Sequence, residues 1–207
     1  MLSLLADQIG KQAYLDWAIT ITALVYVFLA ARENTWCWAW GIVSCSMWAY
    51  ADFFRYNLWA DGILQLFYVG MGIWGLYSWK TGGGKNGPAT NYKPLPIRTL
   101  PIKKHLVLFV VGAALTLVLG YFFHNYTPTA LPYPDSFITA FSILATLLTV
   151  RKILENWLYW IVLDTMAVFV FAAREAMLVA LVMAIYAMIS VVGYAQWRRK
   201  WKATGET

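Results

Sequence analysis

The stretch from Leu106 to Phe123, LVLFVVGAALTLVLGYFF, runs for 18 residues without a charged side chain. A helix of this length spans about 27 Å, close to the ~30 Å hydrocarbon core of a bilayer. The rest of the chain has the same character, because 61% of its 207 residues are hydrophobic and 13% are charged. An average soluble domain has about a quarter of its residues charged. The sequence therefore predicts an all-α integral membrane protein.

Six further apolar runs flank this stretch, and each is bounded by charged or polar turns. The seven predicted transmembrane helices are 15–31, 36–54, 58–79, 106–123, 136–150, 157–173 and 176–197. Between the third and fourth lies the segment 80–104, which contains three consecutive glycines, four prolines and six Lys or Arg residues. That composition predicts an exposed linker. We expect three units: a three-helix unit at 1–80, the basic linker with the fourth helix at 81–134, and a second three-helix unit with a basic tail at 135–207.

The distribution of basic residues predicts the orientation. If the C-terminus is inside, 13 of the 16 Lys and Arg residues fall on the inner side and 3 on the outer side. Cytoplasmic loops carry such an excess, so the C-terminus and the linker are predicted to be cytoplasmic and the N-terminus to be outside. The net charge of +6 therefore does not indicate nucleic-acid binding, because the basic residues lie at the ends of the predicted spans.

The two ends of the chain resemble each other weakly. At a single offset of 118 residues, the matches are Tyr68 with Tyr186, Gly75 with Gly193 and Trp79 with Trp197. A second match aligns the turn Glu33-Asn34 with Glu155-Asn156, which sets Trp36 and Trp40 against Trp157 and Trp160. Chance matching in an aromatic-rich chain is the alternative. With the span count, the matches predict a 3+1+3 arrangement of two parallel triple-helix repeats joined by a linker helix, a design in which transporters hold substrate near mid-membrane.

Polar and aromatic side chains inside the predicted spans are the candidates for a substrate site. Asp164 lies seven residues into an apolar run, where a carboxylate faces either a substrate cavity or a structural hydrogen bond to a neighbouring helix. Gln65 has the same two interpretations, because an amide can bind a ribose hydroxyl or a carboxamide, or join two helices. The proposed substrate-binding residues are Trp40, Ser44, Gln65, Tyr68, Thr149, Asn156, Trp160, Asp164 and Tyr186.

This set of residues suits a flat polar ring that is neutral or positively charged. Indole and phenol faces attract cations, and Asp164 would balance one positive charge. No Lys or Arg lies deep in a predicted span, whereas an anionic substrate would require such residues or helix N-termini. Trp36 and Trp157, nearer the span ends, are also typical of an interfacial aromatic belt.

The sequence lacks the motifs of an energy-coupled pump or an enzyme. There is no GxxxxGK[ST] phosphate loop, and HExxH, GxSxG and CxxC are also absent. Cys37 and Cys45 fit small packing residues in a span. We therefore predict no catalytic residues, no metal and no cofactor.

Several segments resemble the PnuC family of nicotinamide riboside transporters. They are Glu33-Asn34 with Trp36 and Trp40, the run LWAD at 58–61 followed by Leu64-Gln65, WGLYSW at 74–79, and TVRKILENWLYW at 149–160, which is similar to the family signature TRKxxENWLxW. The resemblance covers nearly the whole chain. One departure is that Ser44 and Asp164 stand where the family pattern has Asn.

The resemblance implies a multi-pass protein of the bacterial inner membrane that is similar to SWEET-type sugar carriers. It implies facilitated diffusion of nicotinamide riboside with alternating access, after which a cytoplasmic kinase traps the substrate by phosphorylation. Related members carry thiamine or riboflavin, so those vitamins stay open as substrates. The sequence leaves homo-oligomer formation undecided. A binding subunit that needs a separate ATPase and an integral membrane enzyme are the competing classes.

Overall fold

The computed structural model describes residues 8–10, 13–82, 95–127 and 130–204 of the chain. Within these ranges the structure is helical, apart from one isolated parallel bridge between Arg98 and Ile153. The predicted all-α class is therefore confirmed. The helices are α2 (Tyr14–Ala31), α3 (Cys37–Ala51), the π-helical turn η1 (Asp52–Tyr56), α4 (Trp59–Thr81), α5 (Ile102–Tyr126), α6 (Pro132–Val150), α7 (Asn156–Ala173) and α8 (Met177–Ala203).

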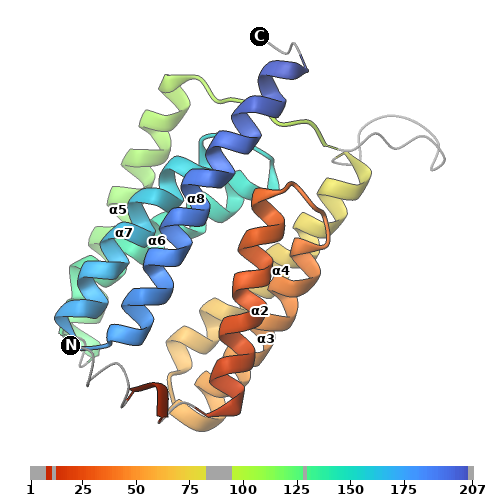
Figure 1. Ribbon diagram of the computed structural model, residues 1–207. Helices are drawn as coiled ribbons and strands as arrows, with labels where there is room; N and C mark the ends of the chain where they lie inside the picture. Colours follow the sequence, from red (N-terminus) through yellow and green to blue (C-terminus); the bar gives the residue numbers. More distant parts are fainter. Residues whose placement is uncertain (1–7, 11–12, 83–94, 128–129, 205–207) are drawn as a thin grey trace.

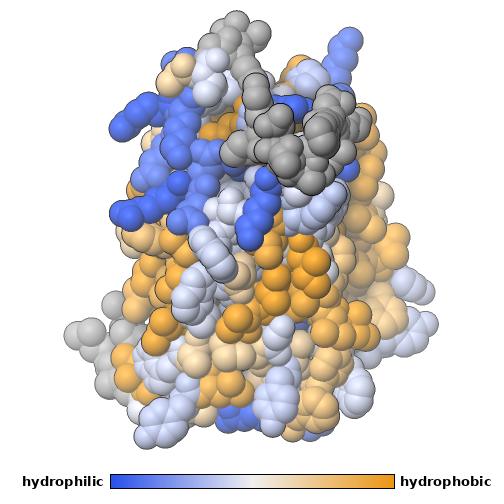
Figure 2. Space-filling model, turned by 90° about the vertical axis from the view of Figure 1, so that its right-hand side faces the viewer, coloured by the Kyte–Doolittle hydropathy of each residue, from blue (hydrophilic) through white to orange (hydrophobic). Residues whose placement is uncertain are grey.

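Five of the described helices, α2, α5, α6, α7 and α8, are long and apolar enough to cross a membrane. By contrast α3 is only 15 residues long, and α4 is rich in Gly, Trp and Tyr, which lower its hydropathy. On the face shown in Figure 2, apolar side chains form a broad band across the middle of the molecule, with hydrophilic side chains gathered above it. Each predicted span coincides with a described helix, while membrane crossing by α3 and α4 stays a prediction.

Two helices begin four residues before their predicted spans, since α5 starts at Ile102 rather than at residue 106 and α6 shows the same shift. α6 starts at Pro132 rather than at residue 136, so the expected boundary between residues 134 and 135 falls inside this helix. Proline suits the first turn of a helix, where no backbone donor is needed. Asp135 belongs to the same first turn, where a carboxylate is favoured by the helix dipole. The charge that suggested an end of the span is thus part of the helix.

The contacts between helices close six of them into a ring. α3 packs between α2 and α4, and α7 packs between α6 and α8. The ring closes because α4 contacts α6 and α8 contacts α2. We call α2–α4 the first triplet and α6–α8 the second triplet, and exchanging them leaves this contact pattern unchanged. α5 packs against α6, reaches α7 through the His105–Tyr159 side-chain contact, and lies outside the ring, at the left edge of Figure 1.

A close contact between glycine and tryptophan occurs once in each triplet. Gly75 of α4 packs against the Trp38 ring, and Gly193 of α8 packs against the Trp157 ring, where an added Cβ would lie 2.8 Å from a ring carbon. Only glycine allows so close an approach. These contacts make Trp38 the counterpart of Trp157, whereas the sequence alignment chose Trp36, which is 63% exposed. The alignment of the second helices is therefore corrected by two residues.

Four buried tryptophans, Trp38, Trp79, Trp157 and Trp197, fill the ring at the end where α8 terminates, and we call them the tryptophan cluster. Trp38 meets Trp79 edge-on with ring centres 5.4 Å apart and planes at 89°, and Trp157 meets Trp197 at 5.5 Å and 86°. The rings of Trp79 and Trp197, from different triplets, lie 5.6 Å apart. The cluster thus joins the two triplets across the ring.

Each of the two central tryptophans also binds the end of a helix in the other triplet. Trp79 Nε1 donates to the carbonyl oxygens of Thr149 and Val150, both at 3.2 Å. Trp197 Nε1 donates to the Ala30 carbonyl oxygen at 3.1 Å. The last carbonyls of a helix lack partners within the helix, so these bonds satisfy groups at the ends of α6 and α2.

An ion pair reinforces this end. Lys152 Nζ lies 2.7 Å from Glu33 Oε1, and Lys200 Nζ lies 2.9 Å from Glu33 Oε2. Glu33 and Lys152 occupy equivalent turns, with φ angles of 62° and 51°. Burial by itself would raise the pKa of Glu33, but the hydrogen bonds from the two lysines outweigh it and the pKa is lowered. Glu33 is therefore ionised at neutral pH.

Part of the predicted exposed linker is docked. Leu95 and Ile97 are buried, with 8% and 6% exposure. Arg98 N donates to Lys152 O at 3.0 Å, and Leu154 N donates to Arg98 O at 2.7 Å. Residues 95–100 are thus held against the turn between α6 and α7, and residues 83–94 of the same linker lie outside the described residues. The expectation failed here because the apolar side chains of Leu95 and Ile97 are isolated in a basic, proline-rich segment.

Candidate functional site

Three tyrosines from different helices converge inside the ring. Tyr26 of α2 lies within electrostatic range of Tyr68 of α4, Tyr186 of α8 and Cys45 of α3. Tyr68 and Tyr186 each lie 11 residues before a central tryptophan of the cluster. At 1.5 Å per residue, this tyrosine layer is about 16 Å along the helices from the tryptophan cluster. It joins both triplets at mid-bundle.

A buried carboxylate borders the tyrosine layer. Asp164 of α7 is 6% exposed, and Ser190 Oγ donates to its Oδ2 at 3.1 Å. Tyr186 lies within electrostatic range of Asp164, and it shares a face of α8 with Ser190 because the two are four residues apart. No further hydrogen bond of this carboxylate occurs among the described residues. The Oδ1 oxygen is thus available to a bound donor or cation.

Tyr68 and Gln65 lie on neighbouring turns of α4. The hydroxyl of Tyr68 interacts with the Ser142 side chain of α6, so it bridges the two triplets. Gln65 is half-buried and precedes Tyr68 by three residues, on the same side of the helix. Its amide makes no hydrogen bond to another residue of the described part of the chain, so a ligand could use both its donors and its acceptor.

Thr149, Asn156 and Trp160 form a separate network nearer the turn between α6 and α7. Asn156 Nδ2 donates to Ile153 O at 2.6 Å, and Thr149 Oγ1 lies 3.1 Å from Asn156 Oδ1. Trp160 Nε1 donates to Thr149 Oγ1 at 3.3 Å. Thr149 and Asn156 are 2% and 0% exposed, and their polar atoms are occupied internally. They are suited to holding Trp160, which is half-buried, rather than to contacting a ligand.

Two predicted residues of α3 are not brought into the tyrosine layer. Ser44 Oγ donates to Ile19 O at 3.2 Å and so ties α3 to α2. Trp40 is 41% exposed. Five residues separate it from Cys45, which turns the two side chains by about 140° around the helix axis. Cys45, rather than Trp40, therefore faces the interior.

The sequence reasoning missed Tyr26 and Cys45. A signal for Tyr26 exists in the sequence, because it places a hydroxyl midway along the otherwise apolar run 23–31. Cys45 carried no such signal, since a cysteine in a span fits packing equally well. In the described residues, no group of three or more His, Cys, Asp or Glu could hold a metal ion.

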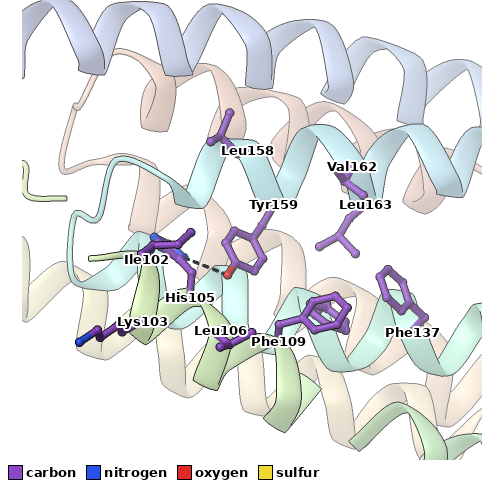
Figure 3. A pocket seen from close by; sticks show the side chains of 11 residues that line it. Ile102, Lys103, His105, Leu106, Phe109, Phe137, Leu158, Tyr159, Val162 and Leu163 are labelled. Atoms are coloured by element: carbon purple, nitrogen blue, oxygen red, sulfur yellow. Dashed lines mark hydrogen bonds between the residues drawn. The ribbon is translucent and has the colours of Figure 1, made fainter. Parts of the chain in front are cut away.

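A pocket of about 530 Å³ lies apart from this layer, outside the ring between α5, α6 and α7 (Figure 3). None of the proposed site residues lines it. Its position and its apolar walls do not match the polar site inferred above.

The family model described as nicotinamide mononucleotide transporter matches residues 13–199. The chain belongs to this family. The resemblance found in the sequence motifs is therefore confirmed, and the protein is a multi-pass member of a transporter family.

Two relatives of this chain are named as nicotinamide riboside transporters. The nicotinamide riboside transporter PnuC of Escherichia coli strain K12 is 27% identical over 202 residues, covering 86% of this chain and 82% of the relative. The nicotinamide riboside transporter PnuC of Neisseria mucosa is 23% identical over 197 residues, covering 92% of this chain and 74% of the relative.

A solved structure has the same fold. The crystal structure of the vitamin B3 transporter PnuC matches with a TM-score of 0.71 at 21% identity, covering 98% of this chain and 90% of the solved one. The match extends over both triplets and α5, so the helical arrangement is that of a known transporter.

Proposed function

We propose that this chain carries nicotinamide riboside across the bacterial inner membrane by facilitated diffusion. The observation that carries the substrate assignment is the buried Asp164 carboxylate, which has one oxygen open beside the tyrosine layer. Nicotinamide riboside has a flat, positively charged pyridinium ring, and aromatic faces with a carboxylate complement such a ring. The names of the relatives support the same substrate.

The family description names the mononucleotide, which carries an additional phosphate. A buried phosphate needs Arg, Lys or exposed backbone donors. The cationic side chain seen buried, Lys152, is paired with Glu33 in the turn region and lies away from the tyrosine layer. The site chemistry therefore favours the riboside over the mononucleotide. Thiamine, which is also cationic, and riboflavin are the alternative vitamins.

The membrane arrangement that we propose has seven spans in a 3+1+3 order, two parallel repeats and α5 as the linker helix. The closed ring of contacts and the paired Gly–Trp contacts support the two repeats. The excess of Lys and Arg at the end where α8 terminates supports a cytoplasmic C-terminus and an external N-terminus. Cysteine-accessibility labelling that reached residue 90 only from outside would contradict this orientation.

Alternating access follows from the two layers. With the C-terminal end cytoplasmic, the tryptophan cluster and the Glu33–Lys152 pair close the inner end below the tyrosine layer. Release into the cytoplasm requires the triplets to separate there, which parts Trp79 from Trp197. Because no energy motif is present, transport runs downhill, and a cytoplasmic kinase would trap the product.

Uptake of labelled nicotinamide riboside into proteoliposomes that contain only this chain tests the function. We expect saturable uptake that stops at equal inside and outside concentrations, that an ionophore leaves unchanged, and that unlabelled mononucleotide inhibits weakly. Binding without uptake would identify a binding subunit that needs a partner. A chemically altered product would identify an enzyme.

Substitutions at the site test the assignment independently of transport. Losing a charge-assisted hydrogen bond costs about 1.5–3 kcal/mol, so Asp164→Ala should weaken binding about ten- to a hundredfold, and Asp164→Asn less. Trp160→Ala should also weaken binding. The matched control is Trp40→Ala, which should keep wild-type affinity because Trp40 lies outside the layer. Wild-type affinity in folded Asp164→Ala protein would rule out this site.

A further inference from the structure

The pocket between α5, α6 and α7 is a groove open toward the surroundings of the bundle. It exists because the backbone of α5 lies close to α6 but not to α7, which α5 reaches through the long side chains of His105 and Tyr159. Phe109, Phe137 and Phe141 line its walls, and Tyr159 lies at its centre (Figure 3). The groove lies on the outer side of the ring, so a substrate crossing between the triplets does not pass through it.

Apolar side chains surround the mouth of the groove. Leu106, Phe109 and Val162 are 65%, 55% and 53% exposed. α5 is the most apolar of the candidate spans, so these side chains face lipid. Water is excluded at this depth, and a groove of this volume with apolar walls must therefore be filled by hydrocarbon.

The two ends of the groove differ in charge. Figure 3 places Lys103 and His105 at one end and Phe137 at the other. Lys103 and Lys104 belong to the exposed first turn of α5, which has no side-chain cap, and neither lysine forms an ion pair with any residue that the structure describes. The neighbouring carboxylate, Glu155, is engaged by the Leu100 backbone N–H at 3.2 Å.

We propose that this groove holds one acyl chain of an anionic phospholipid from the cytoplasmic leaflet, with its phosphate against Lys103, Lys104 and the first turn of α5. The assignment rests on the membrane orientation proposed above, not on the substrate. Two lysines in the first turn of a helix whose N-terminus has no side-chain cap complement a phosphate. The apolar groove begins directly beside them.

His105 and Tyr159 fix the wall between the two parts of this site. His105 Nδ1 lies 3.0 Å from the Tyr159 hydroxyl. The phenol therefore has its polar atom satisfied within the protein and presents its ring to the groove. A hydrocarbon chain can lie along this ring without leaving the Tyr159 hydroxyl unpaired.

Photolabelling in proteoliposomes tests the proposal. The probes are phosphatidylglycerol and phosphatidylcholine that carry the same diazirine-labelled acyl chain, and labelled peptides are located by mass spectrometry. In wild-type protein we expect phosphatidylglycerol to label residues 106–109 and 158–162 about tenfold more than phosphatidylcholine does. Equal labelling by the two lipids would mean ordinary lipid contact and would overturn the proposal.

Two variants separate the headgroup from the chain. The double substitution Lys103→Gln and Lys104→Gln should reduce phosphatidylglycerol labelling to the phosphatidylcholine level. The matched control, Arg199→Gln with Lys202→Gln in the exposed end of α8, removes the same charge elsewhere and should leave labelling unchanged. Val162→Trp, which fills the groove, should reduce labelling by both lipids.

Labelling of wild-type protein requires no variant to fold and no substrate to bind, so its outcome is independent of the uptake assay. Absence of label at residues 106–109 would overturn the proposal. Chemical crosslinking of vesicle-embedded protein would then ask whether a second copy of the chain covers the groove.

Discussion

The two ends of the helical ring are held together differently. At the C-terminal end the contacts cross between triplets, since Trp79 lies against Trp197 and Lys152 is paired with Glu33. At the opposite end, the ion pairs seen between described residues lie within a triplet. They are Asp16 with Arg55 in the first and Asp135 with Arg174 in the second, each pair displaced from the other by 119 residues.

This difference indicates at which end the two triplets separate more easily. Separating the triplets at the C-terminal end breaks buried aromatic contacts, hydrogen bonds and an ion pair. At the opposite end, the polar contacts that the structure describes between the two halves of the chain come from Gln8, which precedes α2. Gln8 donates to Glu175 O and accepts from Leu178 N, at the start of α8. Within the described part of the chain, the same internal repeat therefore carries one closed end and one end with fewer polar contacts between the triplets.

The largest effect should follow from breaking the buried ion pair. Lys152 is 3% exposed, so Lys152→Met leaves Glu33 with only the exposed Lys200, at a cost of about 3 kcal/mol. Thermal unfolding in detergent should show a markedly lower midpoint. Combining Lys152→Met with Glu33→Leu should recover part of the loss, because no unpaired charge remains. A Lys152→Met protein as stable as wild type would show that the pair does not hold this end.

Enlarging the glycine beside a cluster tryptophan should have the next largest effect. Gly75→Ala and Gly193→Ala force Trp38 and Trp157 to move, and such overpacking costs about 1–3 kcal/mol. Gly70→Ala is the matched control on α4, because nothing lies within 4 Å of its added Cβ. The control should be neutral or stabilising by up to ~1 kcal/mol from helix propensity. Equal unfolding midpoints for Gly75→Ala and Gly70→Ala would contradict the close packing.

Acid should weaken the C-terminal end by a smaller amount. The pKa of Glu33 is lowered from its ordinary value of 4.5 by the lysines, so the carboxylate stabilises the fold fully above pH 4.5. This stabilisation is lost as the pH falls through the lowered pKa. The difference in unfolding midpoint between wild type and Glu33→Gln should therefore shrink between pH 7 and pH 3.5. A difference that does not change with pH would mean that the charge of Glu33 is not what stabilises the turn.

The smallest effect is expected at the opposite end. Arg55 is 38% exposed and lies 3.8 Å from Asp16, so Arg55→Met should cost less than about 1 kcal/mol. The loss should diminish further at high salt, because exposed charges are screened. If Arg55→Met destabilised the protein as much as Lys152→Met does, the contrast between the two ends would be wrong.

The helices could be predicted from the sequence because each apolar run is long and bounded by charge or proline. The repeat could be found because Tyr68, Gly75 and Trp79 recur at one offset. The register of the repeat in the second helix of each triplet could not be predicted, because tryptophans stand at positions 36, 38 and 40. A choice among them depends on which indole meets Gly75, and that contact joins two helices.

The candidate site was predicted in part for a similar reason. Asp164 stood out because a carboxylate within an apolar run must find a partner. Thr149 and Asn156 looked equally polar, but the turn between α6 and α7 directs them to each other and to backbone oxygens. Tyr26 was overlooked because the sequence does not reveal that this residue of α2 lies near Tyr68 of α4 and Tyr186 of α8.

The sequence by itself determined the membrane class, the helix positions and the chemistry available at mid-bundle, because hydrophobicity and charge act locally along a chain. Only the tertiary structure decided which side chains meet. Ring closure brings together residues more than a hundred positions apart, such as Trp197 of α8 with Ala30 of α2, and Glu33 with Lys152 in the adjoining turns. Those contacts depend on packing shape between helices, which no local pattern in the chain records.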